Sequence, residues 1–571
     1  MSTRRLTWYL LATALAVCVY LYGLGSPHIP KNGDELVYAH ITRLTAASGH
    51  WLPLQSELDH MRNTKPPLLF WQGIAATHGG ADWSLWQLRY PSVIYTLLTA
   101  LLVFLLARRL AQQRSGPGEV SPTETGYIAA LTFLAFFSTY RFGRPFLVNP
   151  PEVFWFFLPF FTLLYWQSVA FDSRWRLPLL LGIQIGIGLL YKSFALIAPV
   201  GLALAWWYLH RRGYRVRRFL TEDAGKIVLT LAVALVLFSL WFALDPDPRA
   251  IWQEFVVGEN AGKFGARGQG YLANLLWGGS SVWALLVGYP MNAGLLAFPV
   301  AAVFFVAWSQ RGRLGAAETM LWIWMFALFI VFCAPSQRSA RYLLDAMPGL
   351  AVICALHWPR IHRGFFVASL LFAAAVSGLL AFLAVRLQHE VGGLYSAGFW
   401  LLLATTAALL LFGLFSARHV RAVVNVVVLL VTLSLAAFLS PFDGARGSFS
   451  AETQRQVQGR DVWVPCNFRA VDEGYRFLLP GAKVHGYEAL PSLGVAELSS
   501  NYALFAVQLP LDADCPGCQV LGQRLELRSR HSSDEIKRML RGEVFQLLFV
   551  KELLLVAPQA APAQPLREAC R

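Results

Sequence analysis

The stretch from Tyr90 to Ala107, YPSVIYTLLTALLVFLLA, decides the class of fold to which this chain belongs. It contains no Asp, Glu, Lys or Arg, and the basic pair Arg108 and Arg109 follows it directly. Roughly 20 apolar residues in a helix cross the hydrocarbon core of a bilayer, and basic residues gather at the cytoplasmic end of such helices. The stretch is therefore predicted to be a membrane-spanning helix.

Comparable apolar runs occur along most of the first 440 residues. The chain of 571 residues is 56% hydrophobic and only 14% charged, whereas soluble proteins have about a quarter charged residues. We expect an all-α polytopic membrane domain over residues 1–440 with about thirteen spans. They are placed at 7–24, 90–107, 127–142, 151–170, 177–191, 194–209, 227–244, 286–309, 318–334, 347–357, 365–385, 396–416 and 421–440. The first is interpreted as an uncleaved span and not as a signal peptide, because no small-residue cleavage site ends it.

Basic residues between the spans predict the orientation. Arginines cluster in alternate loops, which the positive-inside rule assigns to the cytoplasm together with the N-terminus. These are Arg4, Arg5, Arg108, Arg109, Arg114, Arg174, Arg176, Arg211, Arg212, Arg215, Arg217, Arg218, Arg311, Arg313, Arg360, Arg363, Arg418 and Arg421. The net charge of +15 is thus explained by contact with membrane lipids, and no nucleic-acid-binding motif accompanies it. A multi-pass membrane protein is expected, with segments 25–89, 245–285 and 441–571 outside.

Residues 441–571 are predicted to form a periplasmic soluble α/β domain. Strand-like runs occur at 461–464, 502–509 and 545–556, and Ser532 with Glu535 forms the pattern of a capping box at a helix start. Four cysteines, Cys466, Cys515, Cys518 and Cys570, lie in this exported segment. Structural disulfides are favoured there over half a zinc site or a redox pair, because the chain has no second CxxC. The pairing is left open.

The loop 25–89 carries residues suited to chemistry at a membrane surface. Asp34 and Glu35 are adjacent acids just outside the first span, and Lys65 precedes a diproline and an aromatic segment. A carboxylate can take the proton of an attacking hydroxyl, and a lysine can neutralise a phosphate leaving group. The residues alone equally allow a role without catalysis. In that case Asp34 and Glu35 simply begin a solvated helix, and Lys65 extends its charge to the membrane interface.

The order of motifs in this loop resembles the bacterial protein-mannosyltransferase-like (GT-C) glycosyltransferases, among them the lipid A aminoarabinose transferases. The family pattern is Asp-Glu, then Tyr-Ala, then Ser-Gly-x-Trp, then Lys-Pro-Pro-Leu. The chain has these residues in that order: Asp34, Glu35, Tyr38, Ala39, Ser48, Gly49, Trp51, Lys65, Pro66, Pro67 and Leu68.

Later segments, up to about residue 350, extend the resemblance. Lys192 lies in a turn like the family's Gly-x-x-x-x-Lys-Gly, and Glu259, Asn260 and Lys263 match its Glu-(His/Asn)-x-x-Arg segment. Arg341 and Tyr342, followed by Pro348, are similar to its Arg-Tyr-x-Leu-Pro loop.

The chain departs from the family pattern at two positions. Asn149 stands where many relatives carry an aspartate, with Glu152 nearby as a substitute or as an ordinary acidic helix start. Arg62 stands where an aromatic residue is common. No cofactor is predicted with certainty, and a divalent metal is left open with Asn149 against it, since an amide is a poorer metal ligand than a carboxylate.

The resemblance implies a GT-C fold and transfer, with inversion, of a sugar from a polyprenyl-phosphate donor. The acceptor would be lipid A, another envelope glycan or an exported protein. Asp34 is expected to be the base, with Glu35 shaping its position. The expected phosphate ligands are Lys65, Lys263, Arg341 and Tyr342, with Arg267 and Lys192 secondary; Tyr38, Asn149, Glu152, Arg62 and Glu259 are candidates for the acceptor side. A transporter of lipid-linked sugars and a non-catalytic scaffold are the alternatives.

Overall fold

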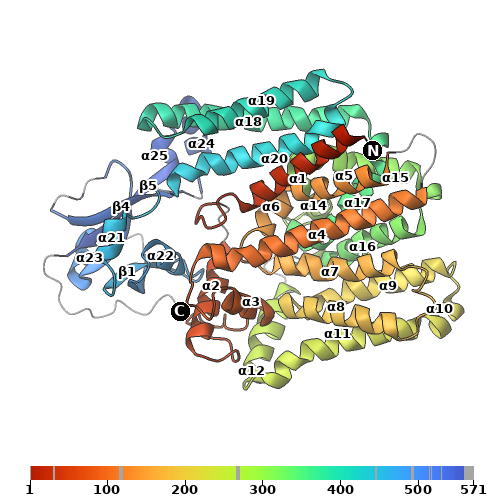
Figure 1. Ribbon diagram of the computed structural model, residues 1–571. Coiled ribbons are helices and arrows are strands. Elements are labelled where there is room, and N and C mark those ends of the chain that lie inside the picture. Colours follow the sequence, from red (N-terminus) through yellow and green to blue (C-terminus); the bar gives the residue numbers. More distant parts are fainter. Residues whose placement is uncertain are drawn as a thin grey trace.

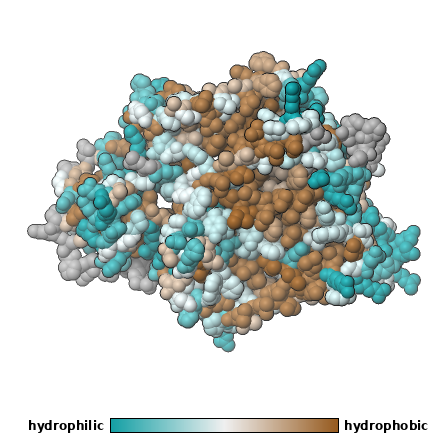
Figure 2. Space-filling model, in the orientation of Figure 1, coloured by the Kyte–Doolittle hydropathy of each residue, from teal (hydrophilic) through white to brown (hydrophobic). Residues whose placement is uncertain are grey.

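The computed structural model describes residues 2–29, 33–114, 120–264, 270–443, 446–489, 494–513, 515, 517–528 and 530–557. Long helices run side by side across the molecule, and a small β-sheet lies beyond one end of them (Figure 1). An apolar belt covers the helices, with hydrophilic surface at both ends of the bundle (Figure 2). This is the surface expected of a protein that crosses a bilayer.

Each of the thirteen apolar ranges falls on one helix or on consecutive helices. The helices of the bundle are α1 (Thr3–Leu21), α4 (Leu85–Arg114), α5 (Pro122–Ala135), α6 (Phe137–Gly143), α7 (Asn149–Tyr165), α8 (Arg176–Tyr191), α9 (Ile197–Arg211), α10 (Val216–Glu222), α11 (Ala224–Leu244), α14 (Val282–Ala293), α15 (Ala297–Ser309), α16 (Ala316–Cys333), α17 (Met347–His357), α18 (Arg363–Val391), α19 (Ala397–Phe415) and α20 (Val420–Leu439). Within the described residues, seven helical stretches are long and apolar enough to cross a membrane. The polytopic all-α membrane domain is therefore confirmed, and the count of thirteen spans stays a prediction.

Small residues allow α8 and α11 to lie close together. A Cβ atom built on Gly182 would lie 2.7 Å from the carbonyl oxygen of Thr230, and one on Gly186 would lie 2.9 Å from Leu237. Glycines four residues apart share one face of a helix, so they form a shallow groove into which α11 packs. A larger side chain at either position would push the two helices apart.

The first loop folds into short helices that pack on the bundle. They are α2 (Gly33–Ala47) and α3 (Leu68–Ala76). The segment after α11 also folds into short helices, which are α12 (Pro248–Ile251), the π-helix η2 (Trp252–Asn260), the 3-10 helix η3 (Ala261–Phe264) and α13 (Tyr271–Trp277). Val37, Tyr38, Phe70 and Phe146 form a buried apolar cluster beneath α2 and α3. Because α2 begins with Gly33 and Asp34, this packing fixes the position of the predicted base.

The chain after α20 contains a five-stranded sheet with the order β2-β1-β3-β5-β4. β1 is parallel to β2 and β3, whereas β5 is antiparallel to β3 and β4. The strands are β1 (Asp461–Cys466), β2 (Lys483–Glu488), β3 (Leu504–Leu509), β4 (Gln519–Leu527) and β5 (Phe549–Val556). The helices are α21 (Ala451–Gln456), α22 (Glu473–Leu478), α23 (Val495–Asn501), α24 (Ser533–Arg541) and α25 (Phe545–Leu548).

The α/β character predicted for this domain is confirmed, with two differences. The capping box of Ser532 and Glu535 is present at the start of α24, as predicted. The expected strand over 545–556 is wrong in its first four residues, which form α25, because an apolar run alone does not distinguish a buried helix from a strand. β2 and β4 were not predicted, since both contain charged and glycine residues that interrupt the pattern of alternation.

A disulfide joins Cys515 to Cys518, as the exported location predicted. Cys466 also takes part in a disulfide, and Cys570 lies outside the described residues. Cys18, Cys333 and Cys354, in the helical bundle, are free thiols. The zinc alternative for Cys515 and Cys518 is thus not supported.

Alkylation of the denatured, unreduced protein is expected to label Cys18, Cys333 and Cys354 and to leave Cys515 and Cys518 unlabelled until a reductant is added. Peptide mass spectrometry measures this directly. Labelling of Cys515 and Cys518 without reductant would show that the bond does not form in the native protein.

Candidate active site

Asp34 lies in the first turn of α2 with about half of its side chain exposed. Its Oδ2 accepts a hydrogen bond of 2.6 Å from Nη1 of Arg341, which belongs to the 3-10 helix η6 (Ala340–Ala346). The hydroxyl of Ser339 accepts from the backbone N–H of Arg341 and so caps the start of η6. The two predicted residues, 307 positions apart in sequence, therefore form one ion pair.

The same guanidinium binds Asn149 at the start of α7. Nε and Nη2 of Arg341 donate to Oδ1 of Asn149 at 3.0 and 2.6 Å, and the guanidinium carbon lies 5.0 Å from the centre of the Phe142 ring. These contacts with Asp34 and Asn149 use three of the five N–H groups of an arginine. Its planar fork is thereby held in one orientation, with donors directed at oxygen atoms.

The hydrogen-bonded chain continues from Asn149 to Lys192. Nδ2 of Asn149 donates to Oε2 of Glu152 at 2.9 Å, and Nζ of Lys192 lies 3.1 Å from the same oxygen. Asn149 and Glu152 are both buried. The two residues that the sequence offered as alternatives therefore act together, and Lys192 pairs with a carboxylate at this position.

Asp345 is a member of this group that the sequence analysis missed. It is buried in η6, four residues after Arg341, and its side chain hydrogen-bonds to Glu152. Burial first, and the charge of Glu152 second, raise the pKa of Asp345 well above its ordinary value. The raised pKa favours the protonated form of Asp345, which can donate a hydrogen bond to Glu152. An acid within the apolar stretch Leu343 to Met347 was the available signal.

Glu35 does not join the Asp34 cluster, although the sequence analysis placed both acids in the catalytic group. It is buried and accepts two hydrogen bonds from Arg89 of α4, at 2.7 and 2.6 Å, and one from the backbone N–H of Phe146 at 2.7 Å. Arg89 also donates to the carbonyl oxygens of Leu24 and Ser26. Glu35 thus holds α2 in place and leaves Asp34 facing Arg341.

Lys65 forms a second cluster with the segment after α11. Its Nζ lies 2.6 Å from Oε1 of Glu259 on η2, and the Lys65 side chain is only 11% exposed. Arg62 pairs with Asp247 at 3.1 Å in the same region. Glu259 is thus a partner of Lys65, and the side chains of Lys263 and Arg267 lie outside the described residues. The ring of Tyr342 packs against Phe332, 5.1 Å away.

Tyr38 lies within electrostatic reach of both clusters. Burial first, then the charge of Asp34, raise the pKa of its phenol, so the hydroxyl stays protonated at neutral pH. Arg341, Glu259 and Glu152 also influence this group. Glu259 of the Lys65 cluster and Glu152 of the Arg341 cluster thus both lie near enough to Tyr38 to influence its phenol.

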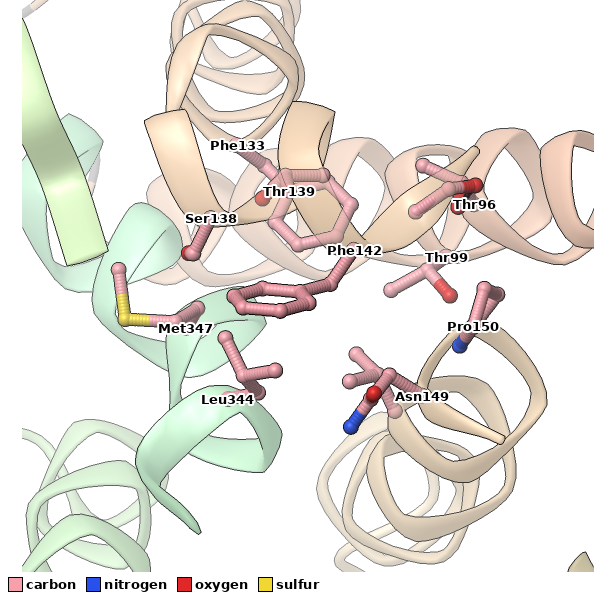
Figure 3. Close-up of a pocket in the computed structure, with 12 residues that line it drawn as sticks. Thr96, Thr99, Phe133, Ser138, Thr139, Phe142, Asn149, Pro150, Leu344 and Met347 are labelled. Atoms are coloured by element: carbon pink, nitrogen blue, oxygen red, sulfur yellow. Dashed lines mark hydrogen bonds between the residues drawn. The ribbon is translucent and has the colours of Figure 1, made fainter. Parts of the chain in front are cut away.

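A small cavity of about 20 Å³ lies beside the Arg341 cluster. In Figure 3 the Phe142 ring lies between Phe133 and Leu344, with Asn149 at the edge of the cavity. The lining is otherwise apolar apart from the hydroxyls of Thr96, Thr99, Ser138 and Thr139. Asn149 and Phe142, which both contact Arg341, thus also line this cavity.

The structure gives no support for a metal site within the residues it describes. No group of three or more His, Cys, Asp or Glu side chains is arranged there to hold an ion. Whether the protein needs a divalent metal stays untested.

Residues 32–253 match the family model of the dolichyl-phosphate-mannose-protein mannosyltransferases. The resemblance predicted from the motifs is confirmed. The undecaprenyl phosphate-alpha-4-amino-4-deoxy-L-arabinose arabinosyl transferase 2 of Pseudomonas fluorescens is 28% identical over 358 residues, 60% of this chain and 58% of that protein. The corresponding transferase of Erwinia tasmaniensis is 28% identical over 333 residues, 57% of this chain and 55% of that protein. The chain thus spans less than two thirds of the length of these relatives.

Solved structures show the same fold over nearly the whole chain. ArnT from Cupriavidus metallidurans bound to undecaprenyl phosphate superimposes with a TM-score of 0.61 at 17% identity, covering 97% of this chain and 99% of that one. The apo form of ArnT gives a TM-score of 0.59 at 18% identity, covering 98% of this chain and all of that one. The GT-C architecture predicted from the sequence is therefore confirmed.

Replacing Glu35 with glutamine should strongly destabilise the protein. The amide can still accept from the N–H of Phe146, but the buried Arg89 loses its counter-charge, and breaking such a pair costs about 3–5 kcal/mol. We expect a clearly lower thermal midpoint in detergent. Asp247→Asn, which breaks the more exposed pair with Arg62, serves as the control and should shift the midpoint little. Equal midpoints for the two variants would contradict this account of Glu35.

Asp345→Asn should flatten the dependence of stability on pH. A carboxyl whose pKa is raised by folding binds its proton more tightly in the folded state, so stability falls as the pH rises above the ordinary carboxyl range. Asparagine removes this loss and keeps a hydrogen-bond donor for Glu152. Thermal midpoints of the variant and wild type between pH 4 and pH 8 measure the difference. A difference that does not grow with pH would mean that Asp345 is ionised in the folded protein.

Proposed function

We propose that this protein is a bacterial inner membrane glycosyltransferase. It transfers a sugar from an undecaprenyl-phosphate donor to an acceptor on the periplasmic side, with lipid A as the leading acceptor and 4-amino-4-deoxy-L-arabinose as the leading sugar. The observation that carries the proposal is the ion pair of Asp34 with Arg341 at the edge of the apolar bundle, beside Asn149 and within reach of the Lys65 cluster. On this proposal, Asp34 as the base and Arg341 and Lys65 as the cations act together at the membrane surface.

The placement of the charges supports an orientation with the N-terminus in the cytoplasm. The N-terminus and the short helix α10, which carries Arg217 and Arg218, lie at the end of the bundle far from the sheet (Figure 1). The end near the sheet holds α2 and α3 of the first loop. By the positive-inside rule the arginine-rich end faces the cytoplasm, so the site and the sheet domain face the periplasm.

In the proposed reaction, the donor phosphate binds between Arg341 and Lys65. Arg341 then turns its donors toward the phosphate and releases Asp34, which takes the proton of the attacking acceptor hydroxyl. The acceptor oxygen bonds to the anomeric carbon as the bond from that carbon to the phosphate oxygen breaks. Lys65 and Arg341 stabilise the charge on the departing polyprenyl phosphate. Lys263, Arg267 and Tyr342 stay proposed as further phosphate ligands.

A second acceptor class has one observation in its favour. The family model that matches residues 32–253 is described by transfer of mannose to protein. An exported protein acceptor would use the same base and phosphate ligands and differ only in the group that supplies the hydroxyl. Both acceptors are therefore offered in the assay below.

Asp34→Asn and Lys65→Ala should both abolish most of the turnover. Asp34→Asn keeps the shape of the side chain and removes the base. A general base typically contributes 10²–10⁴-fold to the rate. Lys65→Ala removes a cation at the leaving group, a loss of about 10²–10³-fold. Lys65→Arg keeps the charge and should retain more activity than Lys65→Ala. Purified protein in nanodiscs, a defined undecaprenyl-phosphate sugar and mass spectrometry of lipid A or protein acceptors provide the measurement.

The matched variants Asn149→Ala and Glu152→Gln distinguish the roles of these two hydrogen-bonded residues. Asn149→Ala removes the acceptor of Arg341 and should slow turnover strongly, whereas Glu152→Gln keeps a hydrogen bond to Asn149 and should act more weakly. Full turnover by folded Asp34→Asn and Lys65→Ala proteins would overturn the proposed function.

A further inference from the structure

A second set of charged residues, outside the candidate active site, joins α2 to the sheet domain. Glu473 begins α22 and its side chain is fully buried. Its two carboxylate oxygens accept from Nε and Nη2 of Arg43 on α2 at 2.9 to 3.1 Å. Arg476, one turn further along α22, lies 3.4 Å from Glu473 and donates to the carbonyl oxygen of Val484. A bidentate pair of this kind fixes both distance and orientation.

His40 lies close to the same carboxylate. Its Nε2 is the atom that accepts the backbone N–H of Glu57 at 3.2 Å, so the ring proton is assigned to Nδ1. Nδ1 lies 3.4 Å from Oε2 of Glu473. Burial raises the pKa of Glu473, but contacts with His40 and Arg43 outweigh it and lower the pKa on balance. Glu473 is therefore a carboxylate held from α2.

Apolar contacts surround this ion pair. Ala470 is fully buried within the cluster formed by Val37, Tyr38 and Phe70 of the first loop. The ring of Phe477 stacks on Trp83 with centroids 5.9 Å apart. The segment 470–477 is thus part of the core of the first loop, although it belongs to the sheet domain in sequence.

α2 is consequently fixed from two sides. Glu35 binds Arg89 of the bundle, and Arg43 binds Glu473 of the sheet domain, with His40 close to the same carboxylate. Asp34 lies nine residues before Arg43, roughly 13 Å along the helix axis. Any tilt of α2 after loss of one attachment moves the Asp34 carboxylate relative to Arg341.

We infer that Glu473 is a positioning residue for Asp34, so that the sheet domain completes the active site by holding α2. The inference rests on the proposed function and assigns to this domain a part in the reaction. Lys65 and Arg341 are not on α2, so donor binding should depend little on Glu473. A displacement of about 1 Å in a reacting group can cost about 10²-fold in rate. Loss of Glu473 should therefore lower kcat and leave the KM for the donor nearly unchanged.

The test compares Glu473→Gln with Glu497→Gln, an exposed glutamate on α23 of the same domain, in full-length protein in nanodiscs. We expect Glu473→Gln to lower kcat at least tenfold with a donor KM within about twofold of wild type. Glu473→Asp, which keeps the charge, should recover part of the rate. Hydrogen exchange over residues 33–47 should rise in Glu473→Gln and not in Glu497→Gln, while α18 to α20 stay unchanged.

A double variant and the hydrogen-exchange measurement distinguish failure of this inference from failure of the proposed function. If Glu473 acts through Arg43, adding Arg43→Gln to Glu473→Gln should lower kcat much less than the product of the two single effects. If Glu473→Gln does not fold, Arg43→Gln alone carries the same test. Unchanged exchange in α2, or a kcat equal to that of Glu497→Gln, would overturn the inference. A wild-type protein without transferase activity would refute the proposed function, and exchange in α2 would still decide whether Glu473 holds that helix.

Discussion

The buried ion pair of Glu35 and Arg89 is the interaction on which the arrangement of the site depends. Removing two charges from water costs several kcal/mol per ion, so such a pair persists only when its remaining hydrogen-bonding groups are satisfied. Here Arg89 also donates to the carbonyl oxygens of Leu24 and Ser26, and Glu35 also accepts from the N–H of Phe146. One pair thereby joins the end of α1, α2, α4 and the segment before α7. Asp34 and Asn149, close in sequence to Glu35 and Phe146, are brought toward Arg341 together.

The sequence alone predicted the bundle and most members of the site, because these depend on local patterns. Apolar runs of the right length predicted where helices occur, and the resemblance of the motifs to a known family pointed to Asp34, Lys65, Asn149 and Arg341. The partner of each charge could not be predicted in this way. Glu35 and Arg89 are 54 positions apart and Arg43 and Glu473 are 430 apart, and no periodicity links residues at such separations. Asp345 was missed for a related reason, since its role appears only when η6 is packed against Glu152.

The cations of the first loop and of η6 each pair with an acid from another segment. Lys65 binds Glu259, Arg62 binds Asp247 and Arg341 binds Asp34. None of these three pairings was predicted from the sequence, and Asp247 received no role there. A phosphate that enters this region has to compete with the carboxylates for the same donors. Such competition favours a doubly charged phosphate leaving group over a singly charged diester, because stronger charge draws Lys65 and Arg341 away from their acids. In the proposed reaction, stabilisation of the phosphate then grows as the bond to the sugar breaks, which is the requirement for catalysis as distinct from binding.

The amide at position 149 is consistent with its surroundings. An arginine only donates and a carboxylate only accepts, so Asn149 must turn Oδ1 to Arg341 and Nδ2 to Glu152, as it does. An aspartate at this place could still accept from Arg341 but would direct a second acceptor at Glu152 across 2.9 Å. Since the side chain of Asp345 already hydrogen-bonds to Glu152, that arrangement would need a further proton or a cation. Asn149, Glu152 and Asp345 are therefore one coupled set. The amide of Asn149 carries no charge, and Glu152, three residues further along α7, supplies the negative charge instead.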